Sequence, residues 1–149
     1  MPQKKLKKPR PLKQSQFDKL RKMAFQVKNK AHAPYSGFQV GAALLTSDGN
    51  FYSGCNVENA SYGGTICAER GAVMKAISEG GKPPIEAVFV ASSSDQAWPP
   101  CGLCLQVLSE FCRATTLIAI FDKNKNEKLY QFSDLLPESF DPSYLKAQT

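Results

Sequence analysis

TICAER, residues 65–70, is the stretch around which this chain is organised, together with its distant partner PCGLC, residues 100–104. The two segments supply three cysteines, Cys67, Cys101 and Cys104, and one glutamate, Glu69. Zinc takes thiolate, imidazole or carboxylate ligands in a tetrahedron, and a catalytic zinc keeps one position open for water. Three cysteines would fill three positions, and Glu69 could move protons without binding the metal. The spacing therefore predicts a catalytic zinc ion, one per chain.

A single C-x-x-C pair is a weak signal, but C-x-E followed some thirty residues later by P-C-x-x-C is specific. It matches the signature of zinc enzymes that remove the amino group from cytosine or adenine. One alternative is a closed Cys₄ site with Cys55 as fourth ligand, although Cys55 and Cys67 are not spaced as a structural pair. Otherwise we expect Cys55 and Cys112 to be small buried residues, and His32, the only histidine, to end a helix.

The expected ligands fall at the starts of two predicted helices, Cys67 in one and Cys101 and Cys104 in the other. The N-terminus of a helix carries partial positive charge, which lowers the pKa of a cysteine and favours the thiolate. Three thiolates and Zn²⁺ leave a net charge of −1. We expect Arg70 to offset this charge through hydrogen bonds to the sulfurs.

Length and composition indicate one ordinary globular domain. The chain has 149 residues, of which 42% are hydrophobic and 21% charged, and single domains typically run to about 100–200 residues. We find neither an apolar run long enough for a membrane span nor a secretory signal. Five cysteines, an odd number, indicate a metal site in a reducing compartment and not a disulfide framework. We therefore expect a cytoplasmic protein.

The positive charge is concentrated at the N-terminus. Residues 1–30 contain eleven Lys or Arg and one acid, whereas residues 31–149 contain eight basic and twelve acidic residues. Residues 1–14 are rich in Pro, Lys and Gln, so we expect a basic disordered arm, followed by one catalytic domain over residues 15–149. A basic arm leaves nuclear entry, nucleic acid or a membrane surface open as alternatives.

The hydrophobic pattern predicts an α/β fold, a three-layer α/β/α domain with a five-stranded mixed sheet. Apolar residues recur at three- and four-residue steps after Ser15, and nearly continuous apolar runs indicate buried strands. Helices are expected at 15–31, 65–79 and 101–113, strands at 38–46, 51–55, 85–92, 116–121 and 127–132, and a helical turn at 133–136.

Five motifs in the right order resemble the cytidine deaminases of the short, homotetrameric, three-cysteine class. They are FQVGAA (38–43), GCNVENASY (54–62), CAER (67–70), PCGLC (100–104) and LLPESF (135–140). The likeness covers about residues 15–146. It implies hydrolysis of cytidine and deoxycytidine to uridine and deoxyuridine with release of ammonia, a step of pyrimidine salvage, by a hydrolase that uses zinc.

The resemblance also implies the roles of individual residues. Cys67, Cys101 and Cys104 bind zinc and Glu69 is the proton shuttle. The substrate-binding residues that it implies are Phe38 beside the pyrimidine, Asn56 and Glu58 at the ribose hydroxyls, Ala60 and Tyr62 at the border of the site, and Phe140. Phe140 is expected to stack on the base in a neighbouring subunit of a homotetramer. From its residue type alone, Phe38 or Phe140 would be taken for core packing.

Three departures from the family pattern stand out. Leu105 occupies the position after the last ligand where the family commonly has Arg, which leaves Arg70 to offset the thiolate charge. Gly71 stands where a small hydroxyl residue is usual, and Gly63 and Gly64 make the preceding loop unusually bare. These departures leave open a lower activity or a slightly different pocket.

Three rival functions stay open. A nucleic-acid editing deaminase, or a nucleic-acid binder, would explain the basic arm, but editing enzymes of this signature typically present H-x-E where this chain has Cys67-Ala68-Glu69. A deaminase of a cytosine-containing antibiotic such as blasticidin S would not need a ribose-binding pair. A zinc protein without activity would release no ammonia. We expect a small nucleoside substrate and no membrane or nucleic-acid partner.

Overall fold

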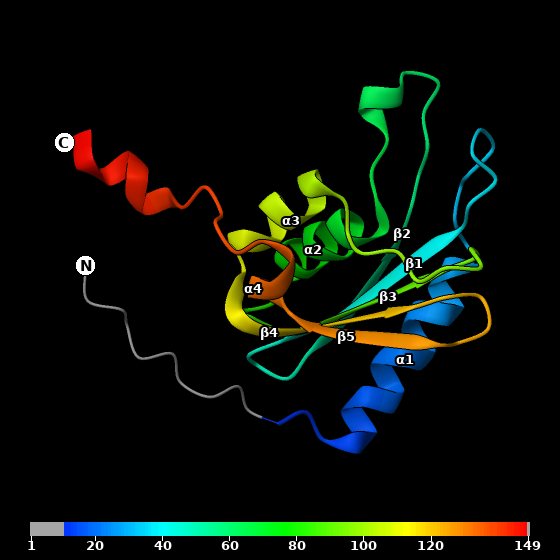
Figure 1. Ribbon diagram of the computed structural model, residues 1–149, viewed down its shortest axis with the longest axis horizontal. Coiled ribbons are helices and arrows are strands. Elements are labelled where there is room, and N and C mark those ends of the chain that lie inside the picture. The colour runs from blue at the N-terminus through cyan, green and yellow to red at the C-terminus, as the bar shows by residue number, and fades with distance from the viewer. Residues whose placement is uncertain (1–10, 149) are drawn as a thin grey trace.

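Five strands form one mixed sheet in the computed structural model, which describes residues 11–148 (Figure 1). The strand order is β2-β1-β3-β4-β5. Strand β1 pairs antiparallel with β2 and β3, β3 pairs parallel with β4, and β4 pairs antiparallel with β5. The strands are β1 (Val40–Thr46), β2 (Phe51–Cys55), β3 (Ile85–Ser92), β4 (Cys112–Phe121) and β5 (Glu127–Gln131).

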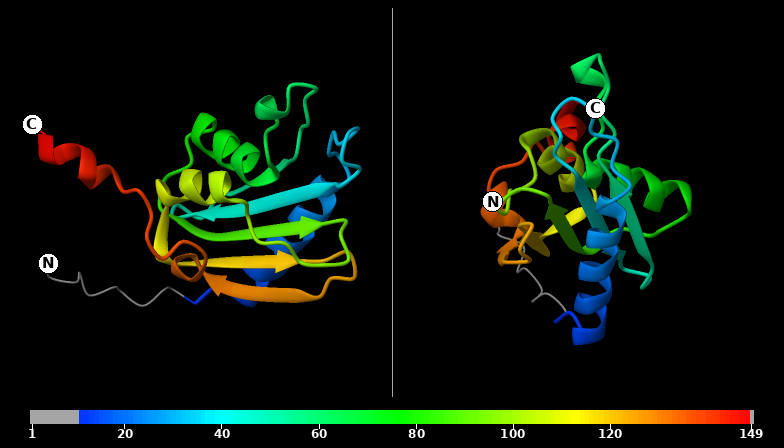
Figure 2. Two further views of the ribbon diagram at one scale, coloured as in Figure 1. Left: turned by 45° about the horizontal axis from the view of Figure 1, so that its top comes forward. Right: turned by 90° about the vertical axis from the view of Figure 1, so that its right-hand side faces the viewer.

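Helices cover both faces of this sheet and give the three predicted layers. Helix α1 (Gln14–Lys28) lies on one face, and α2 (Ala68–Ser78) and α3 (Gly102–Ser109) lie on the other (Figure 2). Because successive side chains of a strand point to opposite faces, β1 sends Ala42 and Leu44 to the α2 side and Ala43 and Leu45 to the α1 side. The predicted fold class is confirmed.

Two glycines allow the helices to approach the sheet closely. A Cβ atom at Gly41 would lie 2.2 Å from the backbone oxygen of Ala24 in α1. A Cβ atom at Gly54 would lie 2.4 Å from the backbone nitrogen of Ala72 in α2. Both distances are far below van der Waals contact, so only glycine fits at either position. The second contact fixes α2, which begins with the last three residues of the TICAER stretch, against β2.

The predicted third helix is wrong at its C-terminal end. It was expected to reach Arg113, but α3 ends at Ser109 and β4 already begins at Cys112. The backbone N–H of Ile85 donates to the carbonyl of Phe111, and Cys112 pairs with Ile85 in the parallel ladder. Cys112 and Arg113 therefore belong to the sheet, although their local hydrophobic pattern would continue the helix.

Smaller differences affect other boundaries. Helix α1 starts at Gln14, one residue before the prediction, and ends at Lys28 instead of 31. Helix α2 starts at Ala68 instead of 65, because Ile66 pairs with Val57 in an isolated bridge. Short helices that complete the chain are η1 (Tyr62–Gly64), α4 (Phe132–Leu135) and η2 (Pro142–Gln148).

Most of the expected disordered arm, residues 1–10, lies outside the described residues. Within residues 11–148, no helix combines the length and the apolar character that crossing a membrane requires.

Candidate active site

The structure brings the three predicted sulfur ligands together from two helix starts. Cys67 is the N-cap residue of α2, Cys101 is the N-cap residue of α3, and Cys104 lies in the first turn of α3. Their Sγ atoms all lie within 4.8 Å of one another. A tetrahedral zinc with Zn–S bonds of about 2.3 Å separates its sulfurs by about 3.8 Å. The donor set therefore fits zinc with only small side-chain shifts.

Neither alternative ligand belongs to this group. All five cysteines are free thiols, and Cys55, at the end of β2, is not one of the three clustered sulfurs. His32 lies beyond the end of α1, where it forms an isolated bridge with Val57. Cys112 opens β4, where burial raises the pKa of its thiol to about 12. The closed Cys₄ alternative therefore has no support among residues 11–148.

The sulfur cluster favours a thiolate at Cys67. A hydrogen bond from the thiol of Cys104, together with Arg70, lowers the pKa of Cys67 to about 5 against the opposing effect of burial. The same contact with Cys67 raises the pKa of Cys104. One proton is thus held within the thiol pair, and a bound cation would displace it because zinc ligates the deprotonated sulfur.

Glu69 lies beside the sulfur group without joining it. Its side chain is 5% exposed, and its Oε2 atom lies 3.7 Å from Cys104 Sγ. Burial is the main cause that raises the pKa of Glu69, to about 7, and the nearby Cys67 thiolate adds to it. The carboxyl group is thus buried at the edge of the cluster, in the position that a proton carrier needs.

Arg70 is directed at the same cluster. Its Nη2 donates to the carbonyl oxygen of Thr65 at 2.8 Å and to Cys67 Sγ at 3.7 Å. Its Nε is buried and has no hydrogen-bond partner among the described residues. Leu105, where the family commonly has Arg, is instead buried in the core on the α2 side. Arg70 is therefore the guanidinium that contacts the sulfurs here.

A cavity of about 310 Å³ opens onto Cys67, Cys101 and Glu69. It contains three of the six residues predicted for substrate binding, Phe38, Asn56 and Glu58, together with several that the sequence did not single out. The lining residues are Ser36, Phe38, Val40, Asn56, Glu58, Thr65, Cys67, Ala68, Glu69, Val90, Ser92, Trp98, Pro99 and Cys101.

Asn56 and Glu58 are both held by hydrogen bonds at the cavity wall. Asn56, 9% exposed, accepts from the Val40 backbone N–H at 2.8 Å and donates to the Phe38 carbonyl at 2.9 Å. Glu58 accepts from the Tyr35 N–H, the Ser36 N–H and the Ser36 hydroxyl. The Ser36 hydroxyl is the main cause that lowers the pKa of Glu58. Glu58 thus presents a fixed carboxylate to the cavity.

Trp98 is the main cavity residue that the sequence reasoning missed. Its ring packs edge-on against Phe38, with ring centroids 4.8 Å apart, and its side chain is 38% exposed. The two aromatic rings form one wall of the cavity. Its position two residues before the PCGLC motif is the available signal in the sequence.

Three predicted binding residues do not line this cavity. Ala60 and Tyr62 belong to the loop that rises above α2 (Figure 1), and Tyr62, 77% exposed, packs edge-on against Tyr35 with ring centroids 6.1 Å apart. Tyr62 borders a neighbouring hollow that shares Ser36 and Glu58 with the cavity. Phe140, 57% exposed, lies in the C-terminal segment that extends from the body. One chain therefore does not assemble all the expected contacts.

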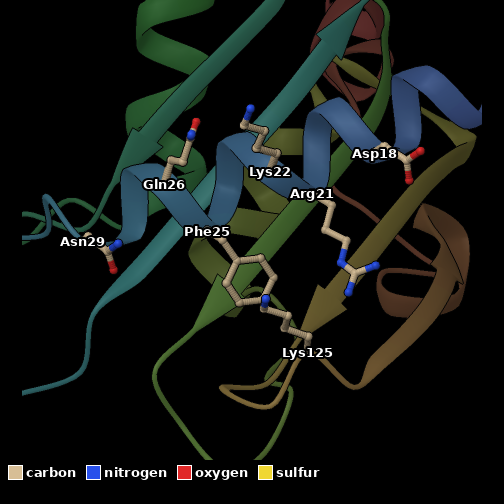
Figure 3. Close-up of a pocket in the computed structure, with 7 residues that line it drawn as sticks. All are labelled: Asp18, Arg21, Lys22, Phe25, Gln26, Asn29 and Lys125. Atoms are coloured by element: carbon tan, nitrogen blue, oxygen red, sulfur yellow. The ribbon is translucent and has the colours of Figure 1, made fainter.

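A second hollow, of about 430 Å³, lies outside this site. It is formed by one side of α1 and the β4–β5 turn, and it contains no thiol and no residue of the predicted site (Figure 3). Its lining residues are Asp18, Arg21, Lys22, Phe25, Gln26, Asn29 and Lys125.

Comparisons with known proteins agree with this arrangement. Residues 14–120 match the model of the cytidine and deoxycytidylate deaminase zinc-binding region. The chain is 46% identical over 119 residues to a cytidine deaminase of Halalkalibacterium halodurans, covering 80% of this chain and 89% of that protein. It is 40% identical over 124 residues to a cytidine deaminase of Mycobacterium tuberculosis, covering 83% and 89%.

Solved structures give the same result. The crystal structure of cytidine deaminase from Burkholderia pseudomallei matches with a TM-score of 0.78 and 40% identity, over 83% of this chain and 98% of that one. The crystal structure of cytidine deaminase from Mycobacterium tuberculosis matches with a TM-score of 0.73 and 38% identity, over 84% and 97%.

Proposed function

The chain belongs to the family of zinc-dependent cytidine and deoxycytidylate deaminases, and from that premise we propose how its cavity deaminates a nucleoside. The reaction is the hydrolysis of cytidine and deoxycytidine to uridine and deoxyuridine with release of ammonia, a step of pyrimidine salvage. The observation that carries the proposal is a cluster of three thiols with a buried carboxyl group beside it, of which Cys67, Cys101 and Glu69 line a cavity of about 310 Å³.

Cys67, Cys101 and Cys104 would hold the zinc ion. When bound there, zinc supplies a Lewis acid that lowers the pKa of a water molecule to about 7. Arg70 donates to Cys67 Sγ and so offsets the negative charge of three thiolates around a divalent ion. The N-termini of α2 and α3 act in the same direction.

Glu69 carries protons between the attacking water, the ring nitrogen N3 and the departing amine. It is buried next to Cys104, so water does not compete for these transfers. General acid–base catalysis of this kind typically contributes ~10²–10⁴-fold to the rate. Glu58, the other carboxylate of the cavity, is occupied by three hydrogen bonds near Ser36 and does not take this role.

We assign the far end of the cavity to the sugar. A carboxylate accepts strongly from hydroxyl groups, and an amide both donates and accepts. Glu58 lines the cavity, and its three hydrogen bonds leave one acceptor site on Oε1 unused. Asn56 keeps one N–H and one lone pair free of its two backbone contacts. Phe38 and Trp98 then pack against the pyrimidine ring.

We propose that the working enzyme is a homotetramer. Phe140 is exposed and does not line the cavity of its own chain, so its predicted stacking contact needs a neighbouring subunit. Its backbone carbonyl accepts from Gln106 Nε2 at 3.0 Å, which ties the start of the C-terminal segment to α3. We also propose that residues 15–149 form the single catalytic domain and that the enzyme works in the reducing cytoplasm.

The proposal is tested by following the loss of cytidine absorbance and the release of ammonia. Cytidine and deoxycytidine should be converted, whereas cytosine, which lacks the sugar, and CMP, which adds a phosphate, should react much more slowly. Blasticidin S serves as the comparator for an antibiotic deaminase. Ammonia release from blasticidin S but not from cytidine would overturn the assignment, and release from no substrate by the zinc-loaded protein would overturn the enzyme.

A further inference from the structure

The second hollow on α1 carries positive charge for which the deaminase reaction has no use. Arg21, Lys22 and Lys125 line it, and Lys28 lies on the same helix beside Phe25. We call these four cations around Phe25 the basic face. Asp18 is the one acidic residue of the hollow, and its carboxylate accepts from Gln14 Nε2 at 3.0 Å.

The cations of the basic face are not neutralised within the described part of the chain. The ion pairs found among residues 11–148 are Lys75–Glu79, Arg113–Glu86 and Lys123–Asp95. None of them involves Arg21, Lys22, Lys28 or Lys125. Helix α1 contains four cations, Lys19, Arg21, Lys22 and Lys28, and one acid, Asp18, while residues 31–149 are mildly acidic. Such an asymmetry attracts polyanions to one side of a protein.

An aromatic ring lies among these cations. Lys28 Nζ and Lys125 Nζ lie 5.2 and 5.9 Å from the centroid of the Phe25 ring, and Arg21 Cζ lies 5.8 Å from that of Phe121. In Figure 3, Arg21 and Phe25 project from one side of α1 toward Lys125 of the β4–β5 turn, whereas Lys22 and Gln26 project from the other side of the helix. Phe25 itself is half-buried against the core and packs edge-on on Phe121, so it holds the two lysines in place and is not a free stacking surface. Clustered cations that can track a phosphate backbone are one component of single-strand binding surfaces.

The β4–β5 turn fixes the position of Lys125. Its φ angle is 67°, in the left-handed region. The Asp122 carboxylate accepts from the N–H of Asn124 at 2.8 Å, the N–H of Asn126 at 2.9 Å and the Asn126 side-chain amide at 2.8 Å. The turn thus holds the lysine backbone beside α1.

We propose that the basic face binds single-stranded nucleic acid. The hollow also offers the amides of Gln26 and Asn29, which can donate to and accept from base edges. An anionic membrane is the poorer fit, because a helix that lies in a membrane surface inserts large apolar side chains. Among residues 11–145, the exposed large hydrophobic side chains lie elsewhere, and none of them belongs to α1.

The bound strand is not the substrate. Helix α1 covers one face of the sheet, whereas the thiols and Glu69 lie at the starts of α2 and α3 on the other (Figure 2). The proposal therefore revises the expectation of no nucleic-acid partner for the face that α1 covers, and it leaves the catalytic cavity to the nucleoside. Binding would place nucleoside deamination close to nucleic acid without occupying the active site.

The test is fluorescence anisotropy of labelled single-stranded RNA and DNA 20-mers with the full-length zinc-loaded protein. If four cations contact phosphates, the single-strand slope of about −0.7 per contact predicts about 50-fold weaker binding at 200 mM than at 50 mM salt. The variant Arg21→Glu/Lys125→Glu should bind at least tenfold more weakly at the lower salt and keep its cytidine turnover. Binding of either or both nucleic acids with this pattern supports the proposal.

A matched control is Lys75→Glu/Lys82→Glu, which makes the same change of net charge at α2 and the loop after it. It should bind within about threefold of the unmodified protein. Equal losses in the two double variants would show that only net charge matters and would overturn the site. Binding to anionic vesicles but to neither nucleic acid would also overturn it. If the glutamate variant loses turnover, Arg21→Ala/Lys125→Ala replaces it, with the same expected weakening.

Discussion

Glu69→Gln is the substitution that isolates the proton carrier from the metal site. Glutamine has nearly the same shape as glutamate, so the buried pocket beside Cys104 stays filled, but an amide cannot shuttle protons. The sulfur cluster does not include Glu69. We therefore expect one zinc per chain and nearly unchanged binding of cytidine, with a large loss confined to turnover.

The size of that loss follows from the contents of the cavity. Glu58 is the other carboxylate in the lining, and its three hydrogen bonds near Ser36 prevent it from replacing Glu69. With no substitute, the full contribution of general acid–base catalysis should disappear, ~10²–10⁴-fold in kcat. That corresponds to about 2.7–5.4 kcal/mol in the barrier.

The assay is steady-state loss of cytidine absorbance, with zinc measured on the same samples. Glu79→Gln is the matched control, because Glu79 follows the same helix and pairs at the surface with Lys75 at 3.9 Å. The control should keep its activity. A Glu69→Gln enzyme that contains zinc and turns over within tenfold of the unmodified enzyme would refute the assignment.

Further substitutions test the packing and the cavity. Gly71→Ala should raise the free energy of unfolding by about 0.5–1 kcal/mol, because the added Cβ meets Cys55 O at an ordinary 3.5 Å. Gly54→Ala should lower the free energy of unfolding by about 3 kcal/mol, because its Cβ would lie 2.4 Å from Ala72 N. Equal urea midpoints for the two variants would contradict both predictions. Trp98→Ala should lower kcat/KM for cytidine by about 2- to 13-fold, the value of one aromatic pair, mainly by raising KM. Trp98→Phe should restore much of the lost kcat/KM. An unchanged KM in Trp98→Ala would exclude contact between Trp98 and the substrate. The Asn126 side-chain amide is the main cause that lowers the pKa of Asp122 below 3.8. The Asp122 carboxylate therefore stabilises the folded state above pH 3.8, and this stabilisation is lost as the pH falls below 3.8. The difference in urea midpoint between pH 5 and pH 3 should therefore shrink in Asp122→Asn, and an undiminished difference would show that other carboxylates cause it.

The sequence predicted the sheet and the metal site well because both depend on local signals. The strand predicted at 85–92 agrees with β3 at both ends, since a short apolar run bounded by turns forms a buried strand. The three cysteines came from spacing alone. Cys67 and Cys101 are the N-cap residues of α2 and α3, so the ligands lie at helix starts as predicted, although α2 begins three residues later than expected.

What the sequence could not predict depends on pairing between distant segments. Helix α3 ends four residues early because Cys112 joins the ladder with Ile85. Trp98 lies in the cavity wall because it packs on Phe38, sixty residues away in the chain. Phe140 is exposed and does not line the cavity of its own chain, and its stacking contact in a neighbouring subunit stays a prediction.

The number and type of ligands at the zinc test the central claim most directly. X-ray absorption at the zinc edge of the resting enzyme should show three sulfurs at about 2.3 Å and one oxygen at about 2.0 Å. Cys55→Ser should leave that spectrum and the zinc content unchanged, whereas Cys104→Ser should lose the ion. Four sulfurs at the metal, or loss of zinc with Cys55→Ser, would contradict an open catalytic site.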